Sequence, residues 1–257
     1  MRVATWNVNG LRARLDFVLA WLRERQPDVV GLQEIKLTDE IFPHDAFAEV
    51  GYRAATHGQK SWNGVAILAR ETPEVTQRGL PGHEGFGARL LAARVGELDF
   101  ATVYVPNGKH LEHEDFARKL TWLEALAEQL EQGFHASRPG VICGDFNVCP
   151  SGLDSWNEAE LGGAIFHTPQ ERQRFEALLS AGFSDLWRKL HPDRQAFSWW
   201  DYRGGAFHRK QGLRIDFLLG TPAARSALQA AEIDRGWRKK RDGLTPSDHA
   251  PVWADLA

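Results

Sequence analysis

Short apolar runs alternate along the sequence with amphipathic helical patterns, and this alternation restricts the fold more than any other feature. The strand-like runs are bounded by glycine, proline or polar residues and cover residues 3–8, 29–32, 64–68, 141–143, 215–219 and 252–256. Apolar side chains recur at helical spacing from Leu11 to Leu22 and from Phe116 to Leu130. Strands that alternate with helices predict an α/β fold.

Two local signals refine this prediction. A third helix is predicted to follow Thr168, because Pro169 suits the first helical position and Glu171 stands where a capping box has its acidic residue. Two further strand-like runs, 89–95 and 98–105, are separated by only two residues, which predicts an antiparallel hairpin. A hairpin inside an α/β chain makes the sheet mixed instead of purely parallel.

The composition is that of a folded, non-membrane protein. The 257 residues are 43% apolar and 25% charged, which suffices for a buried core without disulfides. Cys143 and Cys149 lack the paired spacing of a zinc site and are expected to be buried thiols. No run approaches the ~20 apolar residues that span a bilayer, and no secretory signal precedes the first strand. We therefore expect one cytoplasmic domain over residues 1–257.

Polar residues follow the ends of several predicted strands, where ligands gather in α/β folds. They are Asn7, Asn9, Gln33, Glu34, Asp145, Asn147, Asp216, Asp248 and His249. Taken singly, Asn7 and Asn147 could form turns, and Glu34 could help to cap a helix. Together they supply hard oxygen ligands, a histidine and a spare carboxylate, which metal-assisted phosphoryl chemistry requires.

His249 and Asp216 form the candidate catalytic pair. A carboxylate that is hydrogen-bonded to a histidine holds it in one tautomer and favours its charged form. Phosphodiester hydrolysis also needs an oriented water and stabilisation of the charge on the non-bridging oxygens, and carboxylates with Mg²⁺ meet both needs. An ordinary surface histidine is the alternative interpretation of His249.

Positive charge is concentrated in two segments, although the formal net charge is −3. The segments contain Arg194, Arg203, Arg209, Lys210 and Arg214, and then Arg238, Lys239, Lys240 and Arg241. Two solvated loops would explain both segments. Contacts to phosphates are the alternative, since affinity for nucleic acid depends on lysine and arginine.

Six sequence motifs carry a resemblance to a known family. They are TWNVNGLR (residues 5–12), LQEIK (32–36), YVPNG (104–108), GDFN (144–147), GLRID (212–216) and PSDHAPV (246–252). In this order, over nearly the whole chain, they resemble exonuclease III, the bacterial abasic-site endonuclease family of the endonuclease/exonuclease/phosphatase superfamily. GDFN and SDH recur across the superfamily, whereas YVPNG and SWWDYR (198–203) resemble its DNA-repair branch.

The resemblance implies a fold and an activity. The fold is a four-layer α/β sandwich, with two mixed β-sheets packed face to face and helices on the outside. The implied activity is hydrolysis of double-stranded DNA at abasic sites and at blocked 3′ ends, with 3′ to 5′ exonuclease and 3′-phosphatase or phosphodiesterase work in base excision repair. The protein would be a monomer in the bacterial cytosol, associated with the nucleoid. Its cofactor would be Mg²⁺, with Mn²⁺ as an alternative.

The resemblance also implies residue roles. The catalytic residues would be Tyr104, Asp145, Asn147, Asp216 and His249, and the metal-binding residues Asn7, Glu34, Asp145, Asn147, Asp248 and His249. Glu34 would bind the metal directly, and Asp248 would help to hold it or a second ion. Asp145 would position and deprotonate the attacking water, while Asp216 orients His249.

Recognition of damage is expected to use an apolar pocket, because an abasic sugar can leave the duplex without unstacking a base. The substrate-binding residues would be Arg89, Asn107, Trp199, Arg203, Leu213 and Ile215, of which Trp199, Leu213 and Ile215 line the pocket. Arg89 and the segments 203–214 and 238–241 would hold phosphates. His167 is expected to project toward the pocket and to favour frayed 3′ termini over abasic sugars inside a duplex.

Three other functions fit parts of these observations. A 3′-end-processing specialist with little abasic-site activity would follow if His167 restricts the pocket. A lipid or inositol phosphatase would need a hydrophobic loop or an inositol pocket, and the sequence shows neither. A catalytically silent DNA-binding module would be expected to have lost at least one polar residue of the site. The sequence retains all of them: Asn7, Glu34, Tyr104, Asp145, Asn147, Asp216, Asp248 and His249.

Overall fold

The computed structural model describes the backbone of residues 1–257 and the side chains at all positions except 131 and 132. Its strands form two six-stranded sheets. In spatial order, the first sheet contains β11 (Leu228–Ile233), β12 (Val252–Leu256), β1 (Arg2–Asn7), β2 (Val29–Gln33), β4 (Val65–Ala69) and β3 (Arg53–His57). The second contains β5 (Glu74–Arg78), β6 (Leu90–Val95), β7 (Leu98–Tyr104), β8 (Gly140–Asp145), β10 (Asp216–Gly220) and β9 (Ser184–Asp185).

Both sheets are mixed. Strand β1 pairs in parallel with β2, and β7 pairs in parallel with β8. The other pairings between named strands are antiparallel. In the predicted hairpin, β6 joins β7 with Val95 opposite Leu98. The expectation of mixed sheets is thus confirmed.

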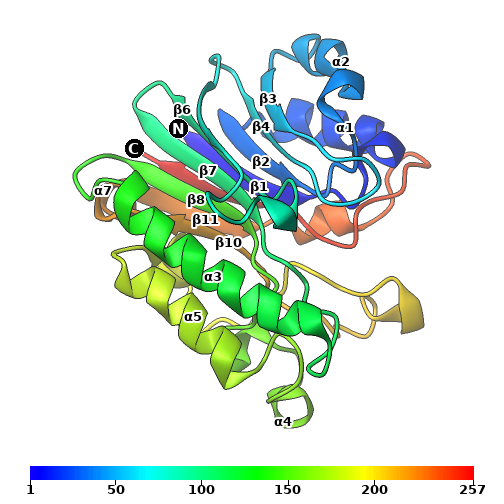
Figure 1. The fold of residues 1–257 in the computed structure, drawn as a ribbon. Coiled ribbons are helices and arrows are strands. Elements are labelled where there is room, and N and C mark those ends of the chain that lie inside the picture. The colour runs from blue at the N-terminus through cyan, green and yellow to red at the C-terminus, as the bar shows by residue number, and fades with distance from the viewer.

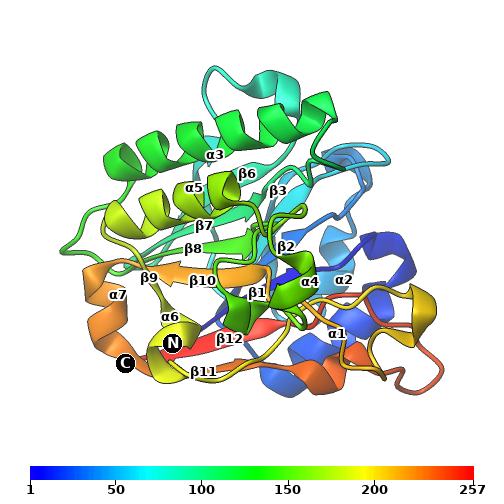
Figure 2. The ribbon, with the colours of Figure 1, turned by 90° about the horizontal axis from the view of Figure 1, so that it is seen from below.

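Helices cover the outer faces of the two sheets. Helices α1 (Leu15–Arg25) and α2 (His44–Ala48) lie on the first sheet, and α3 (Glu114–Gly133) and α5 (Pro169–Ser180) lie on the second. Figure 2 shows the same layers from below, with α3 and α5 on the side opposite α1. The shorter helices are α4 (Glu158–Leu161), α6 (Leu186–Leu190) and α7 (Pro222–Ala227). This arrangement confirms the four-layer sandwich.

Apolar side chains fill the space between the sheets. Val3, Val29 and Ile67 from the first sheet pack with Phe100 and Leu218 from the second. The sheets approach closely at Gly31 in β2, where a Cβ atom would lie 2.6 Å from Thr102 Oγ1 in β7. A larger residue would therefore push the sheets apart. Because both faces of the inner strands are covered, these strands appear in the sequence as continuous apolar runs.

The predicted helices are present, with one correction at the first. Thr168 and Glu171 form the expected capping box at the start of α5, with Glu171 N donating to Thr168 Oγ1 at 3.1 Å. The first helix does not begin at Leu11: a short 3-10 turn ends at Arg14, whose backbone is not helical, and α1 begins at Leu15. Of the helices that the structure describes, none is both long and apolar enough to cross a membrane.

Candidate functional site

Strand ends from both sheets meet at one edge of the sandwich. Parallel pairing of β1 with β2 places Asn7 beside the end of β2, so Glu34 follows next to it. In the second sheet, Tyr104 at the end of β7 lies opposite Asp145 at the end of β8. Because β10 is antiparallel to β8, Asp216 at its start also lies opposite Asp145. Strand direction therefore brings together polar residues that are far apart in sequence.

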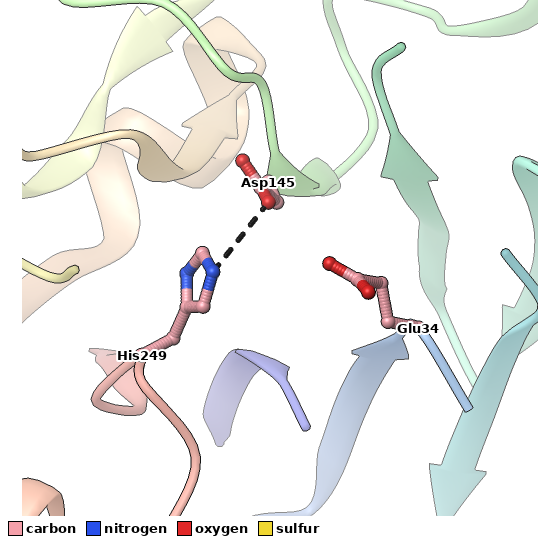
Figure 3. A group of neighbouring side chains, drawn as sticks. All are labelled: Glu34, Asp145 and His249. Carbon is pink, nitrogen blue, oxygen red and sulfur yellow. Dashed lines mark ion pairs between the residues drawn. The ribbon is translucent and has the colours of Figure 1, made fainter. Parts of the chain in front are cut away.

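Glu34 and Asp145 share one hydrogen-bond donor. Asn7 Nδ2 donates to Glu34 Oε1 at 2.8 Å and to Asp145 Oδ2 at 2.9 Å. The other Glu34 oxygen lies 2.9 Å from Lys36 Nζ. Figure 3 shows Glu34, Asp145 and His249 pointing toward a common centre, and one ligand atom of each lies within 4.8 Å of the others. The structure thus brings these three predicted residues together.

His249 lies against Asp216, as predicted. Its Nδ1 is 2.9 Å from Asp216 Oδ2, which also accepts a hydrogen bond from Ser198 Oγ at 2.5 Å. Burial would lower the pKa of His249, but the Asp216 carboxylate and its hydrogen bond raise that pKa on balance. The second ring nitrogen, Nε2, lies 3.8 Å from Asp145 Oδ2. Asp216 therefore holds one nitrogen of the buried His249 ring and favours its charged form, and the other nitrogen lies on the side of Asp145.

Asp145 is almost fully buried, with an exposure of 2%. Burial raises the pKa of Asp145; His249 opposes this shift, and the negative charges of Asp216 and Glu34 reinforce it. Asn147 N donates to Asp145 Oδ1 at 3.0 Å, which fixes the orientation of the carboxylate. A carboxylate with a raised pKa is suited to accept a proton near neutral pH.

Asp248 is held on a different side of the site. Its two oxygens accept hydrogen bonds from Asn9 Nδ2 at 2.9 Å and from Trp199 Nε1 at 3.0 Å. Burial would raise the pKa of Asp248, but the charge of His249 and these hydrogen bonds outweigh it and keep that pKa below its ordinary value. Asp248 is not in the cluster formed by Glu34, Asp145 and His249, so its role as a metal ligand stays a prediction.

A cavity of 320 Å³ opens at this edge of the sandwich. The polar residues around it include Glu34, Tyr104, Asn107, Asp145, Asn147, Asp248 and His249. Asn147 Nδ2 donates to Val105 O at 2.9 Å, which holds the amide in place. Burial raises the pKa of Tyr104 well above its usual value, and the nearby Glu34 carboxylate reinforces the shift, so the phenol keeps its proton. Three of the predicted catalytic residues besides Asp145, namely Tyr104, Asn147 and His249, therefore surround one cavity.

Apolar side chains form one wall of this cavity. Trp199 and Ile215 line it directly. Leu213 belongs to the same apolar cluster as Ile215 and Cys149 but lies behind the lining residues. Trp200, whose burial is nearly complete, packs instead against Phe207 and Ala250, so it is a core residue.

The prediction that His167 projects into the pocket is wrong. Its side chain is 2% exposed, with Nε2 2.9 Å from Ser155 Oγ and Nδ1 3.0 Å from Ile165 O. These contacts hold the imidazole inside the loop. Its neighbours Ile165 and Phe166 line the cavity in its place, and Phe166 has a positive φ of 72° that turns the chain there.

The predicted phosphate-binding arginines differ in accessibility. Arg89 lines a groove of 770 Å³ next to Tyr104, with its guanidinium 4.8 Å from the tyrosine ring. Arg203 is exposed and pairs with Asp201 at the edge of the 320 Å³ cavity. The prediction that segment 203–214 holds phosphates is wrong for Arg214. Its side chain is 1% exposed and lies 2.6 Å from Asp154 Oδ1, so it cannot reach a phosphate.

Two residues that shape the site, Lys36 and Ser198, are not among the predicted site residues. Lys36 Nζ bonds to Asn9 Oδ1 at 2.6 Å as well as to Glu34, and Ser198 holds Asp216. Asn9, Glu34 and Lys36 also have positive φ values of 45°, 52° and 56°. All lie within the quoted motifs, but which atoms they contact depends on how loops from both sheets meet. Such strained backbone is common where a site needs fixed geometry.

The donor atoms at this edge fit a hard divalent cation. Asp145 and Glu34 offer carboxylate oxygens, and His249 offers a ring nitrogen if it is not protonated. The carboxylates of Glu34, Asp145 and Asp248 line this one cavity. An excess of negative charge on oxygen donors favours binding of a cation with oxygen preference. The cluster can therefore hold a metal ion.

Sequence comparison relates this chain to known nucleases. The model of the Endonuclease/Exonuclease/phosphatase family matches residues 4–249. The chain is 37% identical over 274 residues to exodeoxyribonuclease III of Haemophilus influenzae, covering 100% of both chains. It is 33% identical over 263 residues to an exodeoxyribonuclease of Bacillus subtilis, covering 98% of both. To the DNA repair nuclease APEX1 of Danio rerio it is 32% identical over 266 residues, covering 100% of this chain and 82% of that one.

Solved structures agree with these relatives. An AP endonuclease from Archaeoglobus fulgidus matches with a TM-score of 0.95 at 34% identity, covering 100% of this chain and 99% of that one. The 3′ phosphatase NExo from Neisseria, bound to a product DNA hairpin, matches with a TM-score of 0.95 at 38% identity and the same coverage. The sandwich is therefore an architecture that this chain shares with these structures.

Proposed function

This chain belongs to the endonuclease/exonuclease/phosphatase family, and we propose that it is a metal-dependent DNA-repair nuclease that hydrolyses phosphodiester bonds at abasic sites and at 3′ ends. The relatives include exodeoxyribonuclease III, a DNA repair nuclease and a 3′ phosphatase bound to a DNA hairpin. The observation that carries the proposal is the meeting of Glu34, Asp145 and His249 at one cavity.

Asp145 acts as the proton acceptor for the attacking water. Asn7 and Asn147 hold its two oxygens in fixed directions, and burial raises its pKa. His249 stabilises the phosphate with a proton on Nε2, because Asp216 occupies Nδ1. Tyr104, whose phenol stays protonated, donates to another phosphate oxygen. These groups stabilise the charge that develops in the transition state.

Glu34 and Asp145 would hold the metal, with Asn7 beside them and with Asp248 and Asn147 as further ligands. Mg²⁺ is the expected ion, because it prefers carboxylate oxygens and keeps water ligands. When bound, it supplies positive charge to the non-bridging oxygens of the phosphate. Lys36 neutralises the outer oxygen of Glu34, which leaves Oε1 directed toward Asn7 and the centre of the site.

The protein would bind DNA as a monomer, with the cavity as the place of the reaction. Trp199 and Ile215 receive the damaged sugar, whereas Arg89 and Arg203 hold phosphates on either side. A 3′-end-processing specialist is the second candidate, and the likeness to the 3′ phosphatase at 38% identity favours it. In that case Ile165 and Phe166, which line the cavity, would limit access to an abasic sugar inside a duplex.

Cleavage of labelled duplexes tests both candidates. One duplex carries a central abasic analogue and the other a 3′-phosphate, each with Mg²⁺ or with excess EDTA. We expect internal incision and release of phosphate with Mg²⁺, and neither with EDTA, because the carboxylates alone cannot neutralise the phosphate. Release of phosphate without incision would identify the 3′-end specialist. Failure to cleave either duplex with Mg²⁺ would contradict the proposal.

A further inference from the structure

The second basic segment lines one cleft through Arg238, Lys239 and Lys240. Residues 201–208 form one wall and residues 238–246 form the other, around a volume of 490 Å³. We call this the Tyr202 cleft, after the exposed aromatic residue in its wall. Asp201 lines both this cleft and the cavity that contains His249. The cleft therefore adjoins the proposed reaction site.

Aromatic rings and a guanidinium form the inner surface of the cleft. The Arg238 guanidinium lies 4.8 Å from the centre of the Tyr202 ring and 5.3 Å from that of Phe207. Tyr202 is 46% exposed, yet its ring is held in place, because its hydroxyl donates to Pro246 O at 2.8 Å and accepts from Arg14 Nη2 at 3.2 Å. A fixed, exposed ring gives a flat surface on which another ring can stack at low entropic cost.

The rim of the cleft is positively charged. Lys239 and Lys240 are exposed and line it together with the buried Arg238. Among the described residues that line the cleft, Asp201 is the one carboxylate, and it pairs with Arg203 at 2.9 Å. Positive charge around an aromatic surface is the combination that binds single-stranded nucleic acid, with bases on the rings and phosphates on the cations.

An enzyme that draws a nucleotide out of a duplex leaves the opposite base without a partner. We propose that the Tyr202 cleft binds this unpaired base of the complementary strand, stacked on Tyr202, with its phosphates near Lys239 and Lys240. The proposal rests on the proposed function, since the base reaches the cleft only if the nucleotide opposite it occupies the neighbouring cavity. Phosphate contacts alone would need the lysines but not the rings or a volume of 490 Å³.

Single-turnover cleavage with enzyme in excess tests this site. Duplexes with an abasic analogue or a 3′-phosphate are prepared in two forms, with a normal base opposite the reacting nucleotide or with that base removed. The measured quantity is a ratio: the half-saturating enzyme concentration for the form without the base, divided by that for the form that retains the base. Removing the base also alters the duplex itself, so the informative value is the change in this ratio between the wild type and a variant.

We expect Tyr202→Ala to change the ratio about tenfold, equivalent to about 1.4 kcal/mol, by weakening binding of the form that retains the base. Tyr202→Phe keeps the ring but loses the hydroxyl contacts to Pro246 and Arg14, so its ratio should lie closer to that of the wild type than the ratio of Tyr202→Ala does. The double variant Lys239→Gln/Lys240→Gln should weaken binding of both forms and reduce the ratio. Lys189→Gln/Arg225→Gln removes two exposed cations on α6 and α7 and serves as the matched charge control.

The outcomes separate this inference from the proposed function. If the wild type cleaves with Mg²⁺ but Tyr202→Ala has the wild-type ratio, the cleft does not bind the unpaired base and the inference is overturned. The same conclusion follows if the Lys239/Lys240 variant behaves like the Lys189/Arg225 control. If the wild type cleaves no duplex, the nuclease proposal fails first, and with it the premise of the inference.

Discussion

Two buried pairs of opposite charge lie near the site and have different roles. His249 and Asp216 are 3% and 1% exposed, and Lys119 and Glu171 are both 0% exposed. His249 reaches the cavity, with Nε2 beyond hydrogen-bond distance of Asp145 at 3.8 Å. Lys119 lies behind it, within the packing of α3 against α5. Burial and pairing alone therefore do not distinguish a catalytic group from a structural one.

The partners of Lys119 show what it does. Its Nζ donates to Glu171 Oε1, to Asn147 O at 2.6 Å and to Asn107 O at 3.3 Å. Glu171 in turn accepts from Phe166 N at 3.1 Å. The pair thus ties together three segments that line the cavity, while all three donors of the ammonium are directed to protein atoms. Lys119 therefore fixes the segments that line the cavity, whereas Nε2 of His249 is available to a ligand.

The largest expected effect is a loss of turnover when His249 of the His249–Asp216 pair is replaced. His249→Gln should lower turnover by roughly 10²- to 10⁴-fold, since it removes a positioned proton donor. Half-saturation on DNA should change far less, because Arg89, Arg203 and the apolar wall remain. Turnover per folded molecule is measured under single-turnover conditions with circular dichroism as the check on folding. Near-normal turnover would remove His249 from the mechanism.

The next effect is on stability at the second pair. Lys119→Met should lower the free energy of unfolding by about 3–5 kcal/mol, because it leaves Glu171 as an unpaired buried charge. Urea unfolding monitored by tryptophan fluorescence measures this loss. The double variant Lys119→Met/Glu171→Gln removes both charges and should recover much of it. Equal stability of the single variant and the wild type would show that the pair is not structurally important.

A smaller effect is expected at Ser198, which supports the first pair. Ser198→Ala removes the hydroxyl that donates to Asp216 Oδ2 and accepts from Asp216 N. A hydrogen bond to a charged group contributes about 1.5–3 kcal/mol, so turnover should fall by roughly 10- to 100-fold while His249 stays in place. The single-turnover rate constant is the measurement. A loss as large as that of His249→Gln would mean that Ser198 does more than orient Asp216.

The strands predicted from sequence are the inner strands of both sheets, and the strands that were missed are the edge strands. Strands β11 and β3 flank the first sheet, and β5 and β9 flank the second. An edge strand is partly solvated, so its sequence need not be apolar. In β5, exposed and partly buried positions alternate, and none is fully buried. Hydrophobic pattern therefore identified the strands whose faces are covered.

Sequence alone determined which residues make up the site, because the family motifs contain the residue types that the chemistry needs. Asn7, Glu34, Asp145 and His249 were each identifiable from a short segment that follows or precedes a strand. The same segments indicated a metal ion and a phosphate. Their local pattern is strong because a buried strand that ends in polar residues is easily recognised.

Only the tertiary structure decided which predicted side chains reach a ligand. His167 and Arg214 are polar residues in the expected loops, but Ser155 holds the first and Asp154 the second, so both are buried. Residues 201–208 and 238–246, which are separate in sequence, form one cleft around Tyr202. The physical reason is that burial and pairing depend on contacts between distant segments, which no local pattern encodes.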